Sequence, residues 1–256
     1  MKLRIEKEVV VITPTIGQSV LGKAIESVAN QTYKNLKHLV VVDGPEHSPK
    51  AIEVVGRYSH KGIQTVTSPE NTGKTGGDFW GHRIYAAYPH LVNADYVFFL
   101  DEDNWYEPNH VVSLIDKIEE KNYDWAYSLR KIVSKEGEFI IDDCCESLGK
   151  WPVFWSTEQN RQPEYLIDTS AYAFKREFLI QVCSHWHYGW GGDRRFYKIL
   201  TENYKHTNFD TTGLHTLNYR LDDALEKKYG SLDFFTKGNE ILKQYYFGEY
   251  PWLKKI

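Results

Sequence analysis

A chain of 256 residues with a net charge of −4 and a pI of about 6.2 has room for one large domain or two small ones. Lysine and arginine are spread along the sequence, which argues against nucleic acid as a partner. The three cysteines lack the spacing of a disulfide framework, the N-terminus lacks the apolar core of a signal peptide, and no apolar run approaches the ~18 residues of a membrane-spanning helix. We therefore expect a cytoplasmic protein, with any membrane contact peripheral to the inner face and made by its C-terminal tail.

Up to Leu100, short β-branched runs alternate with segments of helical periodicity. The predicted strands cover 9–13, 39–42, 63–66 and 96–100, and the predicted helices between them cover 20–28, 51–55 and 79–88. Strands that are apolar throughout and alternate with helices indicate an α/β fold with a mostly parallel sheet, covered on both faces. Ligands of such sheets bind at the carboxyl ends of the strands.

The pattern changes beyond Pro108. We predict helices over 111–118 and 176–182 and another that starts near Asp193, and strands over 125–133, 139–141 and 165–174. The last thirty residues are polar and aromatic. Since no repeat or Pro/Gly-rich linker interrupts the chain, we favour a single domain of 1–256.

The segment Phe98–Trp105, FFLDEDNW, ends an apolar run in three acids. If the strand continues, Asp101 and Asp103 point the same way and Glu102 points to the opposite side. Carboxylates just beyond a buried strand are suitable oxygen ligands for a hard divalent cation and can also accept hydrogen bonds from a ribose. The alternative interpretation is a solvated turn.

Other candidate donor-binding positions lie at earlier strand ends and in a loop. Asp43 is placed to accept hydrogen bonds from a base or ribose, or to form an Asp-Gly turn. Gly73-Lys74-Thr75 is not a Walker motif, because Ser68 occupies the position of the first glycine. Lys74 and Arg83 still provide cations for phosphates, although a plain flexible loop fits as well.

Two candidate residues lie in the second half. Asp193 follows two glycines at a predicted helix start, which suits an N-cap or an exposed general base. His215 is by default a structural or surface histidine, but imidazole also binds Mn²⁺-type ions beside carboxylates. Tryptophans in this half have flat faces that suit a sugar ring, with core packing as the competing interpretation.

In order and spacing, these segments resemble the family 2 glycosyltransferases, which have the GT-A fold. Ser27–Thr32 resembles the S-x-x-x-Q-T segment of the family, and Val40–Gly44 resembles its second-strand motif. Asn71-Thr72-Gly73 resembles the following loop, and Phe99–Asp103 occupies the place of the DxD motif. Gly192-Asp193 falls where the family has Glu-Asp.

The sequence departs from the family pattern in three places. Asp43-Gly44-Pro45 stands where the family often has Asp-Asp-Gly-Ser, Gly192 replaces an acid, and His215 matches a late metal-binding histidine only by approximate position.

The resemblance implies a GT-A domain with a small second sheet on the acceptor side. It also implies transfer of a sugar from a nucleotide diphosphate sugar, expected to be a UDP-sugar, to a hydroxyl of a glycan or lipid-linked acceptor. Asp43 would hold the base, Asp101 the ribose or a metal-bound water, and Asp103 with His215 a Mn²⁺ or Mg²⁺ ion. Asp193 would be the general base of an inverting displacement. The residues expected to bind the donor are Thr13, Pro14, Thr15, Asp43, Asn71, Lys74, Arg83, Asp101 and Glu102. The residues expected to bind the acceptor are Asp168, which could equally cap a turn, and Trp186, Trp190 and Gly192.

Within this interpretation, about 1–105 form the donor-binding half, about 106–220 the acceptor-binding half, and 221–256 a helical and aromatic tail. A sugar nucleotidyltransferase is one alternative, but no cation follows the first strand until Lys23. A non-catalytic carbohydrate-binding protein is the other, and it would need neither the acids of the DxD segment nor Asp193.

Overall fold

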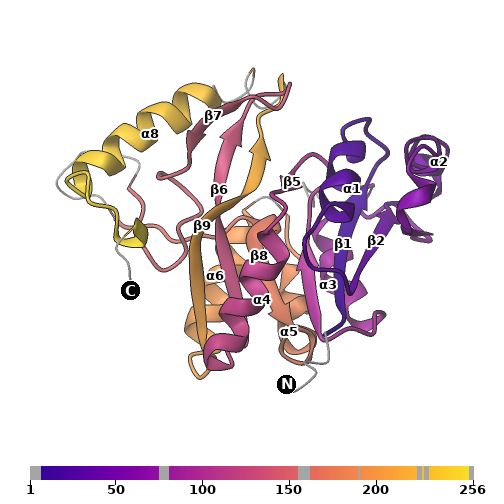
Figure 1. Ribbon diagram of the computed structural model, residues 1–256, viewed down its shortest axis with the longest axis horizontal. Helices are drawn as coiled ribbons and strands as arrows, with labels where there is room; N and C mark the ends of the chain where they lie inside the picture. Colours follow the sequence, from indigo (N-terminus) through magenta and orange to yellow (C-terminus); the bar gives the residue numbers. More distant parts are fainter. Residues whose placement is uncertain are drawn as a thin grey trace.

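The computed structural model describes residues 7–74, 81–154, 162–189, 191–223, 227 and 231–253. The described strands form one mixed sheet in the order β3-β2-β1-β4-β8-β6-β9-β5, and β7 pairs with the outer part of β6. Figure 1 shows the sheet curling from β2 to the long strands β6 and β9, which carry β7 and helix α8 away from the rest of the molecule. A single curled sheet therefore links the two halves of the chain.

The first half of the sheet is parallel. The order there is β3 (Gln64–Thr67), β2 (Leu36–Val42), β1 (Val9–Thr15) and β4 (Tyr96–Phe99), and each neighbouring pair is parallel. Every residue of β1 is buried, as its uninterrupted apolar run predicts. Pro14 is tolerated because pairing with β4 reaches only to Ile12, so the missing N–H is not needed by that neighbour. The carboxyl ends of β1, β2 and β4 therefore meet at one edge.

Antiparallel pairs extend the sheet. β8 (Tyr172–Lys175) is antiparallel to both β4 and β6 (Trp125–Val133), while β9 (Phe209–Arg220) is parallel to β6. β5 (Trp105–Tyr106) and β7 (Phe139–Asp142) add antiparallel partners to β9 and β6. The strands that we expected to form a small second sheet are thus continuous with the central sheet.

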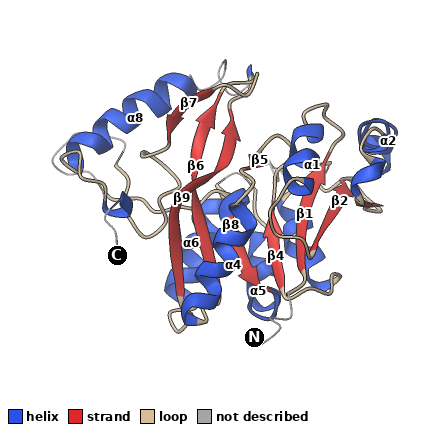
Figure 2. Ribbon diagram, in the orientation of Figure 1, coloured by secondary structure: helices blue, strands red, loops and turns tan. Residues whose placement is uncertain are grey.

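Helices cover the sheet on both sides (Figure 2). They pack their apolar sides onto a core rich in large aromatic residues, among them Trp125, Phe98 and Phe174. The α-helices are α1 (Leu21–Ala29), α2 (Ser48–Gly56), α3 (His82–Ala87), α4 (His110–Lys121), α5 (Arg176–Val182), α6 (Gly192–Asn203) and α8 (Ser231–Tyr245). Short 3₁₀ turns are η1 (Pro45–His47), η2 (Ser59–Lys61), η3 (Tyr88–His90), η4 (Thr169–Ala171), η5 (Cys183–Trp186) and η6 (Pro251–Leu253).

In the second half, one predicted strand was too long and one strand was not predicted. The strand expected over 165–174 is confined to β8, because η4 interrupts the chain just before it. β9 was not predicted at all, although it is the main partner of β6. The part of the third predicted helix at 79–80 lies outside the described residues.

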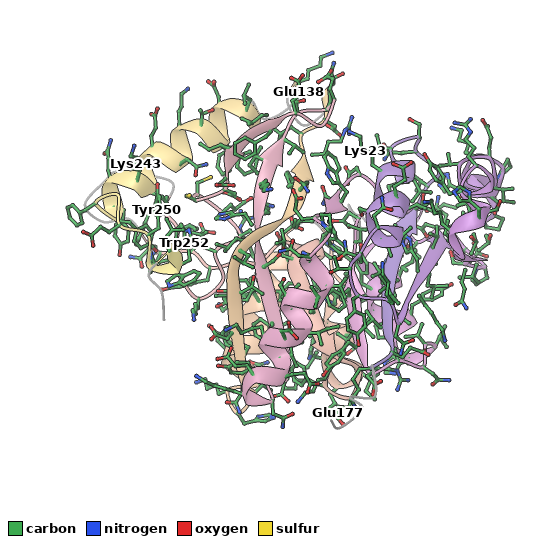
Figure 3. The ribbon with its side chains drawn as sticks, viewed as in Figure 1. Lys23, Glu138, Glu177, Lys243, Tyr250 and Trp252 are labelled. Atoms are coloured by element: carbon green, nitrogen blue, oxygen red, sulfur yellow. The ribbon has the colours of Figure 1, made fainter. Side chains whose placement is uncertain are left out.

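The tail packs back on the second half. Tyr250 and Trp252, labelled in Figure 3, follow α8, and Trp252 contacts Trp151 with ring centroids 5.2 Å apart. Of the helices in the described ranges, none is both long and apolar enough to cross a bilayer.

Candidate active site

The three adjacent acids after β4 lie in three different environments. Glu102 is buried, and its carboxylate accepts hydrogen bonds from the Thr15 hydroxyl (2.5 Å) and from the backbone N–H groups of Ile16 (3.2 Å) and Gln18 (3.1 Å). Burial raises the pKa of Glu102, and these donors oppose the rise. Glu102 therefore holds the loop after β1 in place. Its oxygens are already engaged there, which corrects the prediction that Glu102 contacts the nucleotide directly.

Asp101 is held on the opposite side. One carboxylate oxygen accepts from the Tyr85 hydroxyl at 2.7 Å and the other from the Ser170 hydroxyl at 3.1 Å. Burial raises the pKa of Asp101 to about 8, with further increases from the nearby carboxylates of Asp168 and Asp103. This acid is firmly oriented and sits in a region of crowded negative charge.

Asp103 differs from its two neighbours. Among the described residues no side chain donates a hydrogen bond to its carboxylate, which is half-buried. Burial raises its pKa to about 6, the charge of Glu102 adds to the rise, and Arg220 opposes it. An unclaimed carboxylate within a surplus of negative charge suits a divalent cation that prefers oxygen ligands. Asp103 thus fits the metal role expected of it.

His215 does not lie beside Asp103. It faces Leu129 of β6, and its pKa is lowered by burial and raised by the neighbouring Asp142 and Asp143. The residue of β9 that lies near Asp103 is Arg220. Arg220 comes five residues after His215, which corresponds to roughly 16 Å along an extended strand. The prediction that His215 shares a metal with Asp103 is therefore wrong. The described residues contain no cluster of three His, Cys, Asp or Glu side chains able to hold a metal by themselves.

At the end of β2, Asp43 organises the following loop. Its two carboxylate oxygens accept from the backbone N–H (2.8 Å) and hydroxyl (2.9 Å) of Thr72. Arg83 donates to the Thr72 carbonyl at 2.7 Å, and Asn71 donates to Glu46 at 3.0 Å. Lys74 is exposed at the end of this loop. Asp43, Arg83 and Lys74 are therefore brought to one place, as the sequence suggests.

The end of β1 does not present the polar side chains expected there. The Thr13 hydroxyl is buried against the His38 ring at 2.9 Å, and Thr15 is bound to Glu102. Pro14 is buried and so close to Gly81 that a Cβ on Gly81 would lie 2.7 Å from it. These three side chains are thus occupied in holding the fold, and the contact of Thr13, Pro14 and Thr15 with a donor stays a prediction.

The start of α6 is built around two glycines. Gly191, the N-cap, has a φ of +77°, and a Cβ on Gly192 would lie 2.7 Å from the His82 ring. Asp193 is the second residue of the helix rather than its N-cap. Its Oδ1 accepts from the Arg194 backbone N–H at 2.8 Å, and no other described residue donates to its half-buried carboxylate. Gly192 is therefore needed for close packing against His82, not for contact with an acceptor.

His82 was not identified from the sequence. Its Nδ1 lies 2.7 Å from the Tyr188 carbonyl and must donate there, because a carbonyl only accepts. Burial lowers the pKa of His82, while the nearby charge of Asp193 raises it. His82 thus faces the proposed base from α3.

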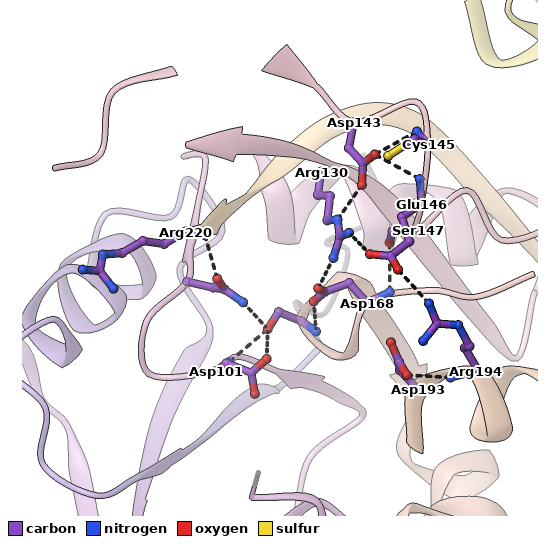
Figure 4. Close-up of polar contacts among 12 residues, drawn as sticks. Asp101, Arg130, Asp143, Cys145, Glu146, Ser147, Asp168, Asp193, Arg194 and Arg220 are labelled. Atoms are coloured by element: carbon purple, nitrogen blue, oxygen red, sulfur yellow. Dashed lines mark hydrogen bonds and ion pairs between the residues drawn. The ribbon is translucent and has the colours of Figure 1, made fainter. Parts of the chain in front are cut away.

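In Figure 4, Asp168 lies between Asp101, which follows β4, and Asp193 at the start of α6. Its oxygens accept from the Ser170 N–H at 2.9 Å and from Arg130 Nη1 at 2.6 Å. Burial raises its pKa, Arg130 opposes the rise, and Asp193 adds to it. Both oxygens of Asp168 accept hydrogen bonds within the protein, and its contact with an acceptor hydroxyl stays a prediction.

Exposed aromatic residues line a cavity beside α6, and they are other residues than the tryptophans predicted to bind an acceptor. Trp186 is fully buried and stacks on Phe196 with ring centroids 4.2 Å apart, so it offers no face to a sugar and its prediction is wrong. Trp190 lies outside the described residues. Tyr165 and Tyr188 are 41% and 44% exposed, and they line a cavity of about 870 Å³ that runs along α6. The Arg195 guanidinium lies 3.6 Å from the centre of the Tyr188 ring.

A family model decides the classification of the chain. The model described as "Glycosyl transferase family 2" matches residues 10–174, which span β1 to β8 and include the acids after β4. The chain belongs to glycosyl transferase family 2. The match ends before α6, so the family assignment does not itself reach Asp193 or His215.

Similar proteins agree with this classification. "Glycosyltransferase GlyA" of Streptococcus pneumoniae serotype 4 is 28% identical over 124 residues, which is 48% of this chain but only 16% of GlyA. The crystal structure of residues 1–349 of TarS from S. aureus has a TM-score of 0.61 at 16% identity, covering 94% of this chain and 72% of that one. GalNAc-T7 with UDP, GalNAc and Mn²⁺ has a TM-score of 0.60 at 14% identity, covering 85% and 44%. Together they confirm a GT-A fold for this family 2 member.

Proposed function

We propose that this protein transfers a sugar from a UDP-sugar to a hydroxyl of a glycan or glycolipid acceptor, with inversion at the anomeric carbon. The proposal rests on three acids from separate segments that lie close together: Asp101 after β4, Asp168 before η4 and Asp193 at the start of α6. Structural neighbours support the donor class, because TarS has been crystallised with UDP and with UDP-GlcNAc.

The first part of the chain would bind the donor. Asp43 would exchange its bonds to Thr72 for bonds to the base, while Arg83 and Lys74 supply positive charge for the diphosphate. Asp101, already oriented by Tyr85 and Ser170, would accept from the ribose. This assigns the donor to about residues 1–105.

Asp103 would hold a Mn²⁺ or Mg²⁺ ion together with oxygens of the donor diphosphate. Such an ion offsets the negative charge that develops as the diphosphate leaves. The residues of this chain contribute an unclaimed carboxylate and a second acid, Asp101, whose position is fixed by hydrogen bonds.

Asp193 would act as the general base. One oxygen is fixed by the Arg194 N–H, which leaves the other to accept the proton of the acceptor hydroxyl. The hydroxyl oxygen forms a bond to the anomeric carbon as the bond from that carbon to the diphosphate breaks.

The acceptor would enter from the side of α6 and be bound by residues of about 106–220. The cavity beside α6 has a volume of about 870 Å³, within the range of ligand pockets, and its exposed tyrosines supply faces for a sugar ring.

Release of UDP from a panel of UDP-sugars with Mn²⁺, with water or a glycan as acceptor, tests the function. Asp193→Asn should lower kcat by about 10²–10⁴-fold, the usual contribution of a general base. A near-normal rate in this variant would remove Asp193 from the mechanism. Pyrophosphate release from UTP and a sugar phosphate, without UDP release from any UDP-sugar, would point to a nucleotidyltransferase instead.

A further inference from the structure

The carboxylate of Asp193 is oriented by the residue that follows it. Its Oδ1 accepts from the Arg194 N–H at 2.8 Å, so the direction of the carboxylate depends on where the backbone of Arg194 is held. The Arg194 side chain leaves the first turn of α6 and donates through Nη2 to Oε1 of Glu146 at 2.9 Å. A second carboxylate, Glu164, lies 3.4 Å from Arg194 Nε. The helix turn that carries Asp193 is thus tied to a different segment of the chain.

Glu146 is itself fixed at two points. Its Oε2 accepts from Arg130 Nη2 at 2.5 Å, and its backbone N–H donates to Oδ1 of Asp143 at 3.0 Å. Arg130 belongs to β6, and its side chain is only 3% exposed. Glu146 therefore connects the rigid central sheet to the start of α6, as Figure 4 shows.

The positive charge of Arg130 is already compensated without Glu146. Its Nε donates to Asp143 at 2.7 Å and its Nη1 to Asp168 at 2.6 Å, and its guanidinium lies 4.2 Å from the centre of the Tyr219 ring. Two buried carboxylates already exceed the single positive charge of Arg130. Glu146 adds a third negative charge, and the cation that offsets it is Arg194, the neighbour of Asp193.

We propose that Glu146 and Arg194 are positioning residues that fix the direction of the Asp193 carboxylate through the chain Arg130, Glu146, Arg194 and the Arg194 N–H. This inference rests on the proposed role of Asp193 as the base. Neither side chain needs to touch the substrates, and both act through the geometry of the first turn of α6. Small misplacements of a reacting group lower rates steeply, since a shift of about 1 Å can cost about 10²-fold.

The test measures UDP release from a UDP-sugar in the presence of Mn²⁺ for the full chain and a set of variants. Glu146→Gln keeps the shape of the side chain and removes its charge, while Arg130 keeps two carboxylate partners. We expect kcat to fall by about 10- to 10²-fold with the KM for the UDP-sugar changed by less than about 2-fold. Arg194→Gln should give the same loss, and Arg194→Lys should restore part of it. Glu53→Gln, which breaks the exposed pair of Glu53 with Arg57 on α2, is the matched control and should retain the full rate.

A double-variant cycle separates positioning from general damage. If Glu146 acts only through Asp193, Glu146→Gln added to Asp193→Asn should lower kcat by less than about 2-fold further. An equal loss in both backgrounds would overturn the proposal, and so would an unchanged kcat in Glu146→Gln and Arg194→Gln while Asp193→Asn is inactive. A fully active Asp193→Asn would instead remove Asp193 from the mechanism, whereas no UDP release from any UDP-sugar by the unsubstituted protein would refute the proposed function. Thermal unfolding of each variant identifies any that fails to fold, and Arg194→Lys then provides the remaining comparison.

Discussion

Gly192→Ala tests whether the start of α6 depends on its contact with His82. A Cβ at this position would lie 2.7 Å from both Cε1 and Nδ1 of the His82 ring, a separation that real Cβ atoms essentially never show. The His82 ring cannot simply turn away. Its Nδ1 donates to the Tyr188 carbonyl, and its centroid lies 5.3 Å from the ring centroid of the buried Trp186. Either His82 or the first turn of α6 must move.

The expected cost combines two effects. Overpacking of a well-packed site costs about 1–3 kcal/mol, and loss of the hydrogen bond to Tyr188 adds about 1 kcal/mol. The total is about 2–4 kcal/mol, and for a chain of this size about 1 kcal/mol corresponds to a decrease in Tm of roughly 2–4 °C, so Gly192→Ala should lower Tm by roughly 4–16 °C.

Gly56→Ala is the control for this measurement. Gly56 is the last residue of α2, and a Cβ there would meet nothing within 4 Å. Alanine should leave stability unchanged or raise it by up to about 1 kcal/mol, because it reduces the freedom of the unfolded chain. Thermal or urea unfolding of the three proteins compares them directly. If Gly192→Ala is as stable as Gly56→Ala, the close contact with His82 does not explain this glycine.

The remaining predictions concern the acids after β4. Because the folded-state pKa of Asp101 is raised to about 8, the folded protein binds this proton more tightly than the unfolded chain, so metal-free stability should fall as the pH rises from about 4 to 8. Asp101→Asn should flatten that part of the Tm-against-pH curve, and an unchanged slope would contradict the assignment. Asp103→Asn should greatly raise the Mn²⁺ concentration needed for half-maximal UDP release, whereas His215→Ala should leave it unchanged; the opposite pattern would restore His215 as a ligand. Glu102→Gln should lower the urea-unfolding free energy by about 1–3 kcal/mol, because an amide leaves some of the loop donors unpaired.

The parallel half of the fold could be predicted because its strands are continuous apolar runs. The acids that follow β4 could be predicted by the same logic, since polar residues at the end of a buried strand mark the edge where ligands bind. β9 gave no such signal. Its residues 209–216 alternate poorly, include Gly213 with a φ of +66°, and expose Leu214. Pairing with β6 holds this segment in a strand, and that long-range contact leaves no local pattern in the sequence.

The same limit applies to the candidate site. His215 was placed by its position along the chain, but the register of β9 against β6 decides where it lies, and that register brings Arg220 rather than His215 to Asp103. Trp186 was interpreted as a sugar-binding face, yet the surrounding aromatic rings bury it completely. Residue type indicated which side chains could bind a metal or a sugar, whereas tertiary packing decided which of these side chains lie at the candidate site.

Three consecutive acids after β4 are tolerated because the fold separates their tasks. Glu102 receives its donors from the loop after β1, and Asp101 receives its donors from α3 and η4. No described side chain donates a hydrogen bond to Asp103, and the rise in its pKa is opposed only by a hydrogen bond from its own backbone and by the charge of Arg220. An acid that the protein leaves uncompensated beside two firmly held ones is where a cation gains most by binding. Asp101 and Glu102 are held by hydrogen bonds and the third acid, Asp103, is the open one, so the metal requirement of the enzyme should depend on Asp103 more than on the total number of carboxylates.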